Sequence, residues 1–207
     1  MSALPESSAV PVPPLARERL VPLLRGALAL ALGVVITFSP DHSARFGAVA
    51  FGVFALATAA VLAVGAVADR RASRPLGQGL LLLALALAAG VMVLLLPAEL
   101  FVGVVSAWAL LSGAVELVGG LIARRAGRTA RDGIVTGALL LLLAVVLLVV
   151  PPDYSQPWQV IGDEGVEASG AVTADIMTVG IIGAWAVIHG LLLVIQALTP
   201  RRPEPAP

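Results

Sequence analysis

Two ionisable side chains lie inside long apolar runs of this chain, and both can exchange protons. Glu116 lies in "GVVSAWALLSGAVELV", and His189 lies in "GIIGAWAVIHGLLLVI". A charge in a hydrocarbon environment is costly, so an ionisable residue within such a run indicates a functional site. Imidazole titrates near neutral pH. The two residues together therefore suggest a proton relay inside a helix bundle.

Ser112 belongs to the same group of candidate intramembrane polar residues. It precedes Glu116 by one helical turn and aligns with His189 when the two similar segments are superposed. At about 100° per residue the three side chains share one side of their helices, beside a side of small residues, so we expect them to face protein. Two other interpretations stay open: Glu116 could reach interfacial Arg or water, and His189 could hydrogen-bond a backbone carbonyl.

The runs that carry these residues are long enough to cross a bilayer. Hydrophobic residues make up 59% of the 207 residues and charged residues 13%, whereas soluble domains are usually about a quarter charged. About 20 apolar residues span the hydrocarbon core as a helix, and lipid leaves no alternative partner for backbone amides. The sequence shows six such runs, near 20–39, 45–68, 78–96, 99–123, 133–150 and 174–198. They leave no room for a soluble catalytic domain.

A repeated pattern organises the six runs into pairs. Gly, Trp and Gly recur at the same offsets in runs 4 and 6, and runs 1, 3 and 5 each end near a proline, which cannot extend a helix. The first pair has Gly47, Gly52 and Ala57 at the offsets of Gly, Trp and Gly. In run 4 the three residues are Gly103, Trp108 and Gly113, and in run 6 they are Gly180, Trp185 and Gly190. The proposed hairpin turns are Pro40, Pro97 and Pro151.

The repeat predicts an all-α membrane protein of six transmembrane helices, arranged as three parallel-repeat helical hairpins with approximate threefold symmetry. The hairpins cover residues 20–70, 76–125 and 131–199, and the third contains an insertion at 151–173. The Pro- and Ser-rich segment 1–19 is expected to be a disordered tail, and 200–207 forms the other tail.

Small residues are predicted to pack the helices closely. Gly133 and Gly137 form a GxxxG pair, and Gly103, Gly113, Gly180 and Gly190 line the small-residue faces of runs 4 and 6. Trp108 and Trp185 lie deeper than the interfacial position that Trp usually takes. We therefore interpret both as packing residues against a glycine-notched neighbour.

The distribution of Arg predicts the orientation. The chain has 13 basic residues, all Arg. Twelve of them lie on the side of the predicted bundle that carries both tails, and Arg45 alone lies on the opposite side. Short basic segments stay in the cytoplasm, which places both termini there. The insertion 151–173 is then extracytoplasmic. It is acidic and carries Tyr154 and Trp158, and it could be a lid, a partner-docking surface or an insertion whose aromatic residues rest at the lipid headgroups.

Several functional classes lack their residues. The chain has no Cys and two distant His residues, so we expect no metal site. It has no Lys for a phosphate-binding loop, no G-x-S-x-G motif and no basic face with interleaved aromatic residues for nucleic acid. We expect no cofactor and no enzymatic activity.

The stretch "RGALALALGVVITFSP", followed by the Gly/Trp/Gly helix, resembles the HdeD-like acid-resistance membrane proteins over residues 20–199. The resemblance implies a multi-pass protein of the bacterial inner membrane, built from a short hairpin repeat and linked to acid or envelope stress. One alternative is a small proton, ion or solute transporter or channel that uses Glu116 and His189. Another is an accessory subunit of a larger membrane complex. The expected partners are membrane lipid and either a membrane protein or a second copy of the chain.

Overall fold

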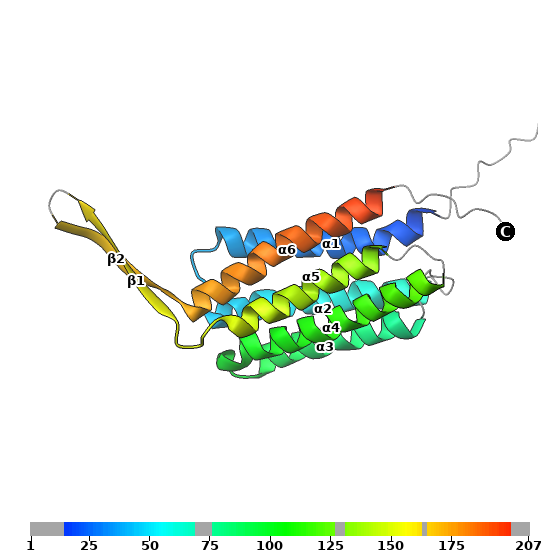
Figure 1. The fold of residues 1–207 in the computed structure, drawn as a ribbon, viewed down its shortest axis with the longest axis horizontal. Helices are drawn as coiled ribbons and strands as arrows, with labels where there is room; N and C mark the ends of the chain where they lie inside the picture. The colour runs from blue at the N-terminus through cyan, green and yellow to red at the C-terminus, as the bar shows by residue number, and fades with distance from the viewer. Residues whose placement is uncertain (1–14, 69–75, 127–130, 163–164, 200–207) are drawn as a thin grey trace, which may run out of the picture.

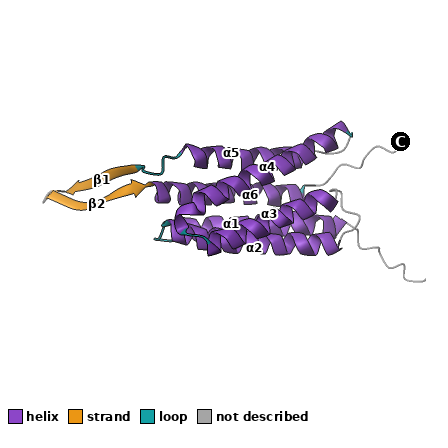
Figure 2. Cartoon of the chain, turned by 90° about the horizontal axis from the view of Figure 1, so that it is seen from below, coloured by secondary structure: helices purple, strands orange, loops and turns teal. Residues whose placement is uncertain are grey.

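The computed structural model describes residues 15–68, 76–126, 131–162 and 165–199, and most of them are helical (Figures 1 and 2). All six long helices are apolar and long enough to cross a membrane, which confirms the prediction of six apolar helices. They are α1 (Leu15–Phe38), α2 (Ala44–Ala68), α3 (Leu76–Leu95), α4 (Phe101–Arg125), α5 (Arg131–Val149) and α6 (Ala174–Leu198), and a short 3-10 helix η1 (Ala98–Leu100) precedes α4.

The ends of the helices lie close to the predicted boundaries except at the start of α1. Helix α1 begins at Leu15, so part of the segment 1–19 that was predicted to be a disordered tail is helical. A run of Leu, Val and Ala follows directly, and the helix extends backward from it. The remainder of this tail, the tail 200–207 and six of the Arg residues counted above (Arg70, Arg71, Arg74, Arg128, Arg201 and Arg202) lie outside the described residues.

The three prolines predicted as hairpin turns each lie just beyond the end of a helix. Pro40 follows α1, Pro97 follows α3 and Pro151 follows α5. In the first turn the Ser43 backbone N–H donates to Asp41 Oδ1 at 2.8 Å, and this bond lowers the pKa of Asp41. The Ser43 hydroxyl then accepts from the Phe46 N–H at 3.2 Å, so Ser43 caps the start of α2.

The helices form a closed ring in chain order. Helix α2 also contacts both α4 and α6 across the middle of the ring. The most extensive contacts are α1 with α6, α2 with α3, and α4 with α5, so each close pair joins helices from two different hairpins. The two helices of one hairpin are consecutive in the sequence, but each helix packs most extensively against a helix of another hairpin.

Segment 151–173 differs from the predicted all-α fold. It contains two antiparallel strands, β1 (Ser155–Gly162) and β2 (Gly165–Thr173), which project beyond the end of the bundle (Figures 1 and 2). Trp158 pairs with Gly170 across the strands, and a Cβ on Gly170 would lie 2.9 Å from the Trp158 ring. The indole therefore covers the glycine, a contact known to support glycine in strands.

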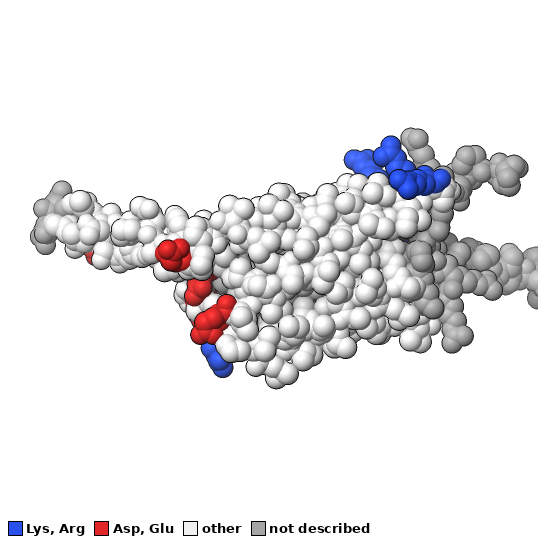
Figure 3. Space-filling view, turned by 60° about the horizontal axis from the view of Figure 1, so that its bottom comes forward, with Lys and Arg blue, Asp and Glu red and all other residues white. Residues whose placement is uncertain are grey.

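Charge is segregated along the bundle. On the face shown in Figure 3, basic side chains gather at the end where α4 meets α5, and acidic side chains gather at the end that carries the β-hairpin, with one basic side chain beside them. Arg124, Arg125 and Arg131 are exposed at the basic end. The middle of this face carries no charged side chain among the described residues, as a surface in contact with hydrocarbon requires.

Candidate polar site inside the helix bundle

An ion pair lies inside the bundle, between helices that are far apart in the sequence. Arg25 of α1 and Glu116 of α4 are 3.5 Å apart, measured from Nη1 to Oε1. The Glu116 side chain is 0% exposed and that of Arg25 10%. Arg25 lies inside the apolar span Arg19–Phe38, and Glu116 lies inside Ala98–Arg125. A buried carboxylate needs both charge compensation and hydrogen bonds, and Arg25 supplies one of each.

Gln78 of α3 provides a second polar contact for Glu116. Its Nε2 donates to Glu116 Oε2 at 3.4 Å and lies 3.4 Å from the Val115 carbonyl oxygen. The Gln78 amide lies against Gly119, where a Cβ would overlap it. Glycine at this position therefore lets α3 bring the amide to the carboxylate. Side chains from α1, α3 and α4 meet at one group.

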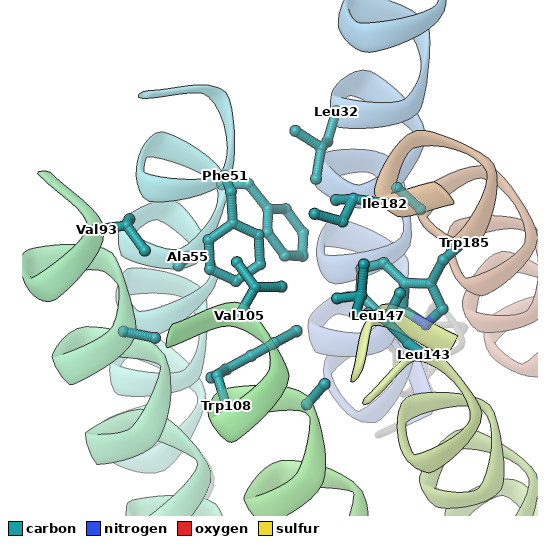
Figure 4. Packing of buried hydrophobic residues seen from close by; sticks show 14 of the residues in the cluster. Leu32, Phe51, Ala55, Val93, Val105, Trp108, Leu143, Leu147, Ile182 and Trp185 are labelled. Carbon is teal, nitrogen blue, oxygen red and sulfur yellow. The ribbon is translucent and has the colours of Figure 1, made fainter. Parts of the chain in front are cut away.

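Three aromatic residues from the three central helices pack next to this site. The ring centroids of Phe54, Trp108 and Trp185 lie 6.3 Å, 6.3 Å and 5.8 Å apart, and all three pairs meet edge to face. This geometry is favourable for aromatic pairs. Figure 4 shows both tryptophans within the buried cluster, together with Phe51, which lies 5.1 Å from Trp108. Both tryptophans thus pack against aromatic rings.

A polar residue follows each member of the aromatic triangle by one helical turn. Thr58 follows Phe54, Ser112 follows Trp108 and His189 follows Trp185. These three polar residues are 4%, 3% and 4% exposed. The His189 ring stacks on Trp185 with centroids 4.7 Å apart.

The three polar residues line one small cavity, and all six helices contribute to its wall. About 20 Å³ of this cavity is open to the centre of a water molecule, which is enough for one or two waters. Arg25 also lines it, so the cavity adjoins the ion pair. The remaining wall is apolar.

The structure thus brings the predicted polar residues Glu116, Ser112 and His189 to one region. Sequence reasoning missed Arg25, which had been grouped with the Arg residues that set orientation. Its position inside an apolar span was a usable signal, since only charges that are paired or functional persist there. Gln78 and Thr58 carried no such signal, because neither residue is ionisable.

The predicted packing glycines divide into two groups. A Cβ on Gly190 would lie 2.8 Å from the Gly26 carbonyl oxygen, and one on Gly113 would lie 3.0 Å from that of Gly137. Gly133 likewise lies against Gly120. These glycines bring α6 against α1 and α4 against α5. By contrast, a Cβ built on Gly103 or Gly180 would meet no described atom of a neighbouring helix within 4 Å, so these two glycines lie outside the close contacts between the described helices.

The alignment of the first repeat also needs a correction. The predicted register put Gly52 at the position of the two tryptophans, whereas Phe54 takes the third place beside them. Gly52 faces α3 instead, where a Cβ would meet Leu94. The glycines of this helix favour the register of Gly52, because the register of Phe54 has Val49 and Ala59 at the two flanking positions. The bulky ring identifies the register that the structure adopts.

The chemistry available at the site is proton exchange and hydrogen bonding. Carboxyl and imidazole groups, such as those of Glu116 and His189, are the side chains here whose chemistry includes proton exchange, while Arg25, Gln78, Ser112 and Thr58 supply hydrogen-bonding groups. No group of three or more His, Cys, Asp or Glu residues in the described ranges could hold a metal ion.

Comparison with known proteins gives one match. Residues 24–95 match the family described as a short repeat of unknown function (DUF308). This segment covers most of α1 and all of α2 and α3. No curated protein and no solved structure matches the chain.

Proposed function

We propose that this chain is a non-enzymatic, multi-pass protein of a bacterial plasma membrane, of the HdeD-like type, which supports tolerance of acid or envelope stress. The observation that carries the proposal is the Arg25–Glu116 ion pair at 3.5 Å inside a bundle of six apolar helices. Uptake of a proton by Glu116 removes one charge of the pair and leaves the Arg25 charge in an apolar interior. The interior of the bundle is thereby coupled to acidity.

We expect the tryptophan fluorescence to report this coupling. The chain has three Trp residues, and Trp158→Phe leaves only Trp108 and Trp185, both next to the site. Acidification of this variant in lipid nanodiscs should change the indole emission reversibly. The double variant Arg25→Leu/Glu116→Leu has no ion pair to break, so the same change should be absent from it. His189→Gln, tested in parallel, separates any contribution of the imidazole. An unchanged acid response in the double variant would contradict the proposal.

The same variants test the physiological part of the proposal. In a strain of the host bacterium that lacks the gene, the wild-type chain should restore survival in acid. Arg25→Leu/Glu116→Leu should restore little of it despite equal abundance in the membrane. Equal survival of both strains would show that the ion pair has no part in stress tolerance.

We propose that both termini face the cytoplasm. The charge segregation in Figure 3 supports this orientation, because exposed Arg residues mark the end where α1 begins and α6 ends. Because the chain has no Cys, single-cysteine variants need no further background change. We expect an impermeant maleimide to label Val160→Cys in intact cells, and to label Ala126→Cys only after the membrane is opened. The reverse result would invert the orientation.

We also propose that the three hairpins are related by approximate threefold symmetry about the bundle axis. Phe54, Trp108 and Trp185 support this arrangement, since the three rings from α2, α4 and α6 make similar contacts with one another. Each is followed after one turn by a buried polar residue. The exposed apolar side chains of the helices, such as Val34, Val145 and Leu148, would contact membrane lipid.

A second candidate function is passage of protons or a small solute through the bundle. The cavity lined by all six helices favours it, because a path along the axis must cross this layer. Purified protein in liposomes would then carry a proton flux that His189→Leu reduces. Well-folded protein without flux would exclude this candidate and leave the acid-tolerance proposal standing.

A further inference from the structure

Three buried polar atoms around the cavity have no hydrogen-bond partner among the described protein atoms. They are Thr58 Oγ1, Ser112 Oγ and His189 Nδ1. Each belongs to a residue that is at most 4% exposed. A buried polar atom without a partner is destabilising, and most buried polar atoms in native proteins bond to protein or to ordered water. Three in one layer of the bundle therefore need a common explanation.

The three atoms are on different helices and converge on one space. Thr58 is on α2, Ser112 on α4 and His189 on α6, and all three residues line the same cavity. The helices are held at this level by the edge-to-face contacts of Phe54, Trp108 and Trp185. Bringing the three helices closer together at this level would disrupt the aromatic packing. A small molecule bound in the cavity would instead give these atoms hydrogen-bond partners.

The size and charge of the cavity define that molecule. The space of about 20 Å³ open to a water centre excludes anything much larger than water. Arg25 lines the wall and pairs with Glu116, so the opposite charges offset each other and an ionic ligand gains little. Two hydroxyl groups and an imidazole nitrogen offer both donors and acceptors.

We infer that this cavity is a binding site for water, held by Thr58, Ser112 and His189 in the middle of the bundle. The bound water also lies beside Arg25, because Arg25 lines the same cavity. It therefore links the imidazole to the ion pair through hydrogen bonds. This inference goes beyond the acid-tolerance proposal and does not depend on it.

Nuclear magnetic resonance of the histidines tests the site with water itself as the probe. The chain has only two His residues, so ¹⁵N-histidine labelling in lipid bilayers gives two imidazoles. We expect polarisation to transfer from water protons to His189 Nδ1, with the chemical shift of a hydrogen-bonded nitrogen. His42, which lies in the turn between α1 and α2, is the positive control. Transfer to His42 without transfer to His189 would overturn the inference.

A matched set of variants places the water. The double variant Thr58→Val/Ser112→Ala removes both hydroxyl groups at nearly constant volume and should weaken the transfer to His189 several-fold. Ser106→Ala removes an equally buried hydroxyl on α4 that does not line the cavity, and it should leave the transfer unchanged. If both variants reduced the transfer equally, or neither did, the assignment of the water to these hydroxyl groups would be wrong. None of these outcomes depends on the acid response of Glu116.

Discussion

Glu116→Leu alone is expected to destabilise the helix bundle by about 3–5 kcal/mol, because it leaves the Arg25 guanidinium as an uncompensated charge in a buried site. Arg25→Leu alone should cost a similar amount, since the fully buried Glu116 would lose its cation. Each single change also breaks the direct link between α1 and α4. The free energy of unfolding, measured by steric trapping in bicelles, gives both values.

The double variant Arg25→Leu/Glu116→Leu should recover most of this loss. Replacing a whole buried ion pair by packed apolar residues is often neutral or stabilising by about 1–4 kcal/mol. The repeat suggests that Leu fits both places. Leu82 corresponds to Arg25, because each lies at the same distance before its proline, Pro97 or Pro40. Leu193 corresponds to Glu116, because each follows its tryptophan, Trp185 or Trp108, by two turns. Leu82 and Leu193 are 3% and 1% exposed.

The double-mutant cycle therefore separates stability from function. A double variant as unstable as the sum of the single variants would show that the two charges do not compensate each other, and the ion pair would lose its place in the proposal. A stable double variant without the acid response would indicate that the pair is retained for function. In that case the pair would cost little to remove as a whole, and stability alone would not account for its presence.

The sequence predicts the helices of this fold more completely than it predicts the contacts between them. Six apolar runs can only satisfy their backbone groups as helices in lipid, so the six spans follow from composition. Helix rotation depends on which side chains interlock, and the glycines of the first repeat favour one register whereas the ring of Phe54 favours another. Phe54 decides between them because a ring fills the space beside Trp108 and Trp185, and this space is visible only in three dimensions.

The polar site shows the same division. Glu116 and His189 stand out in the sequence because a charge or an imidazole in an apolar run needs an explanation. Arg25 escaped because an Arg near the start of a span also fits an orientation signal, and only the 3.5 Å distance to Glu116 separates the two interpretations. The β-hairpin was missed because most of its side chains are exposed, so no buried face imposes an alternation of apolar and polar residues.

The second large effect concerns the glycines between helices from different hairpins. Gly137→Ala should destabilise the bundle by about 1–3 kcal/mol, the usual cost of adding a carbon atom to a tightly packed contact. The new Cβ would lie 2.5 Å from the Leu117 backbone nitrogen and 2.7 Å from the Gly113 carbonyl oxygen. Both atoms belong to the backbone of α4, so no side-chain rotation relieves the overlap. The α4–α5 contact must open.

Gly103→Ala is the matched control, because its added Cβ would meet no described atom of a neighbouring helix within 4 Å. Alanine is favoured over glycine in a helix interior by about 0.5–1 kcal/mol, so this variant should be neutral or slightly stabilised in the same unfolding measurement. The two substitutions add the same methyl group, and only the neighbouring backbone distinguishes them. Equal destabilisation by both would mean that Gly103 also lies in a helix contact. No loss in either would mean that α4 and α5 do not approach as closely as Gly113 and Gly137 indicate.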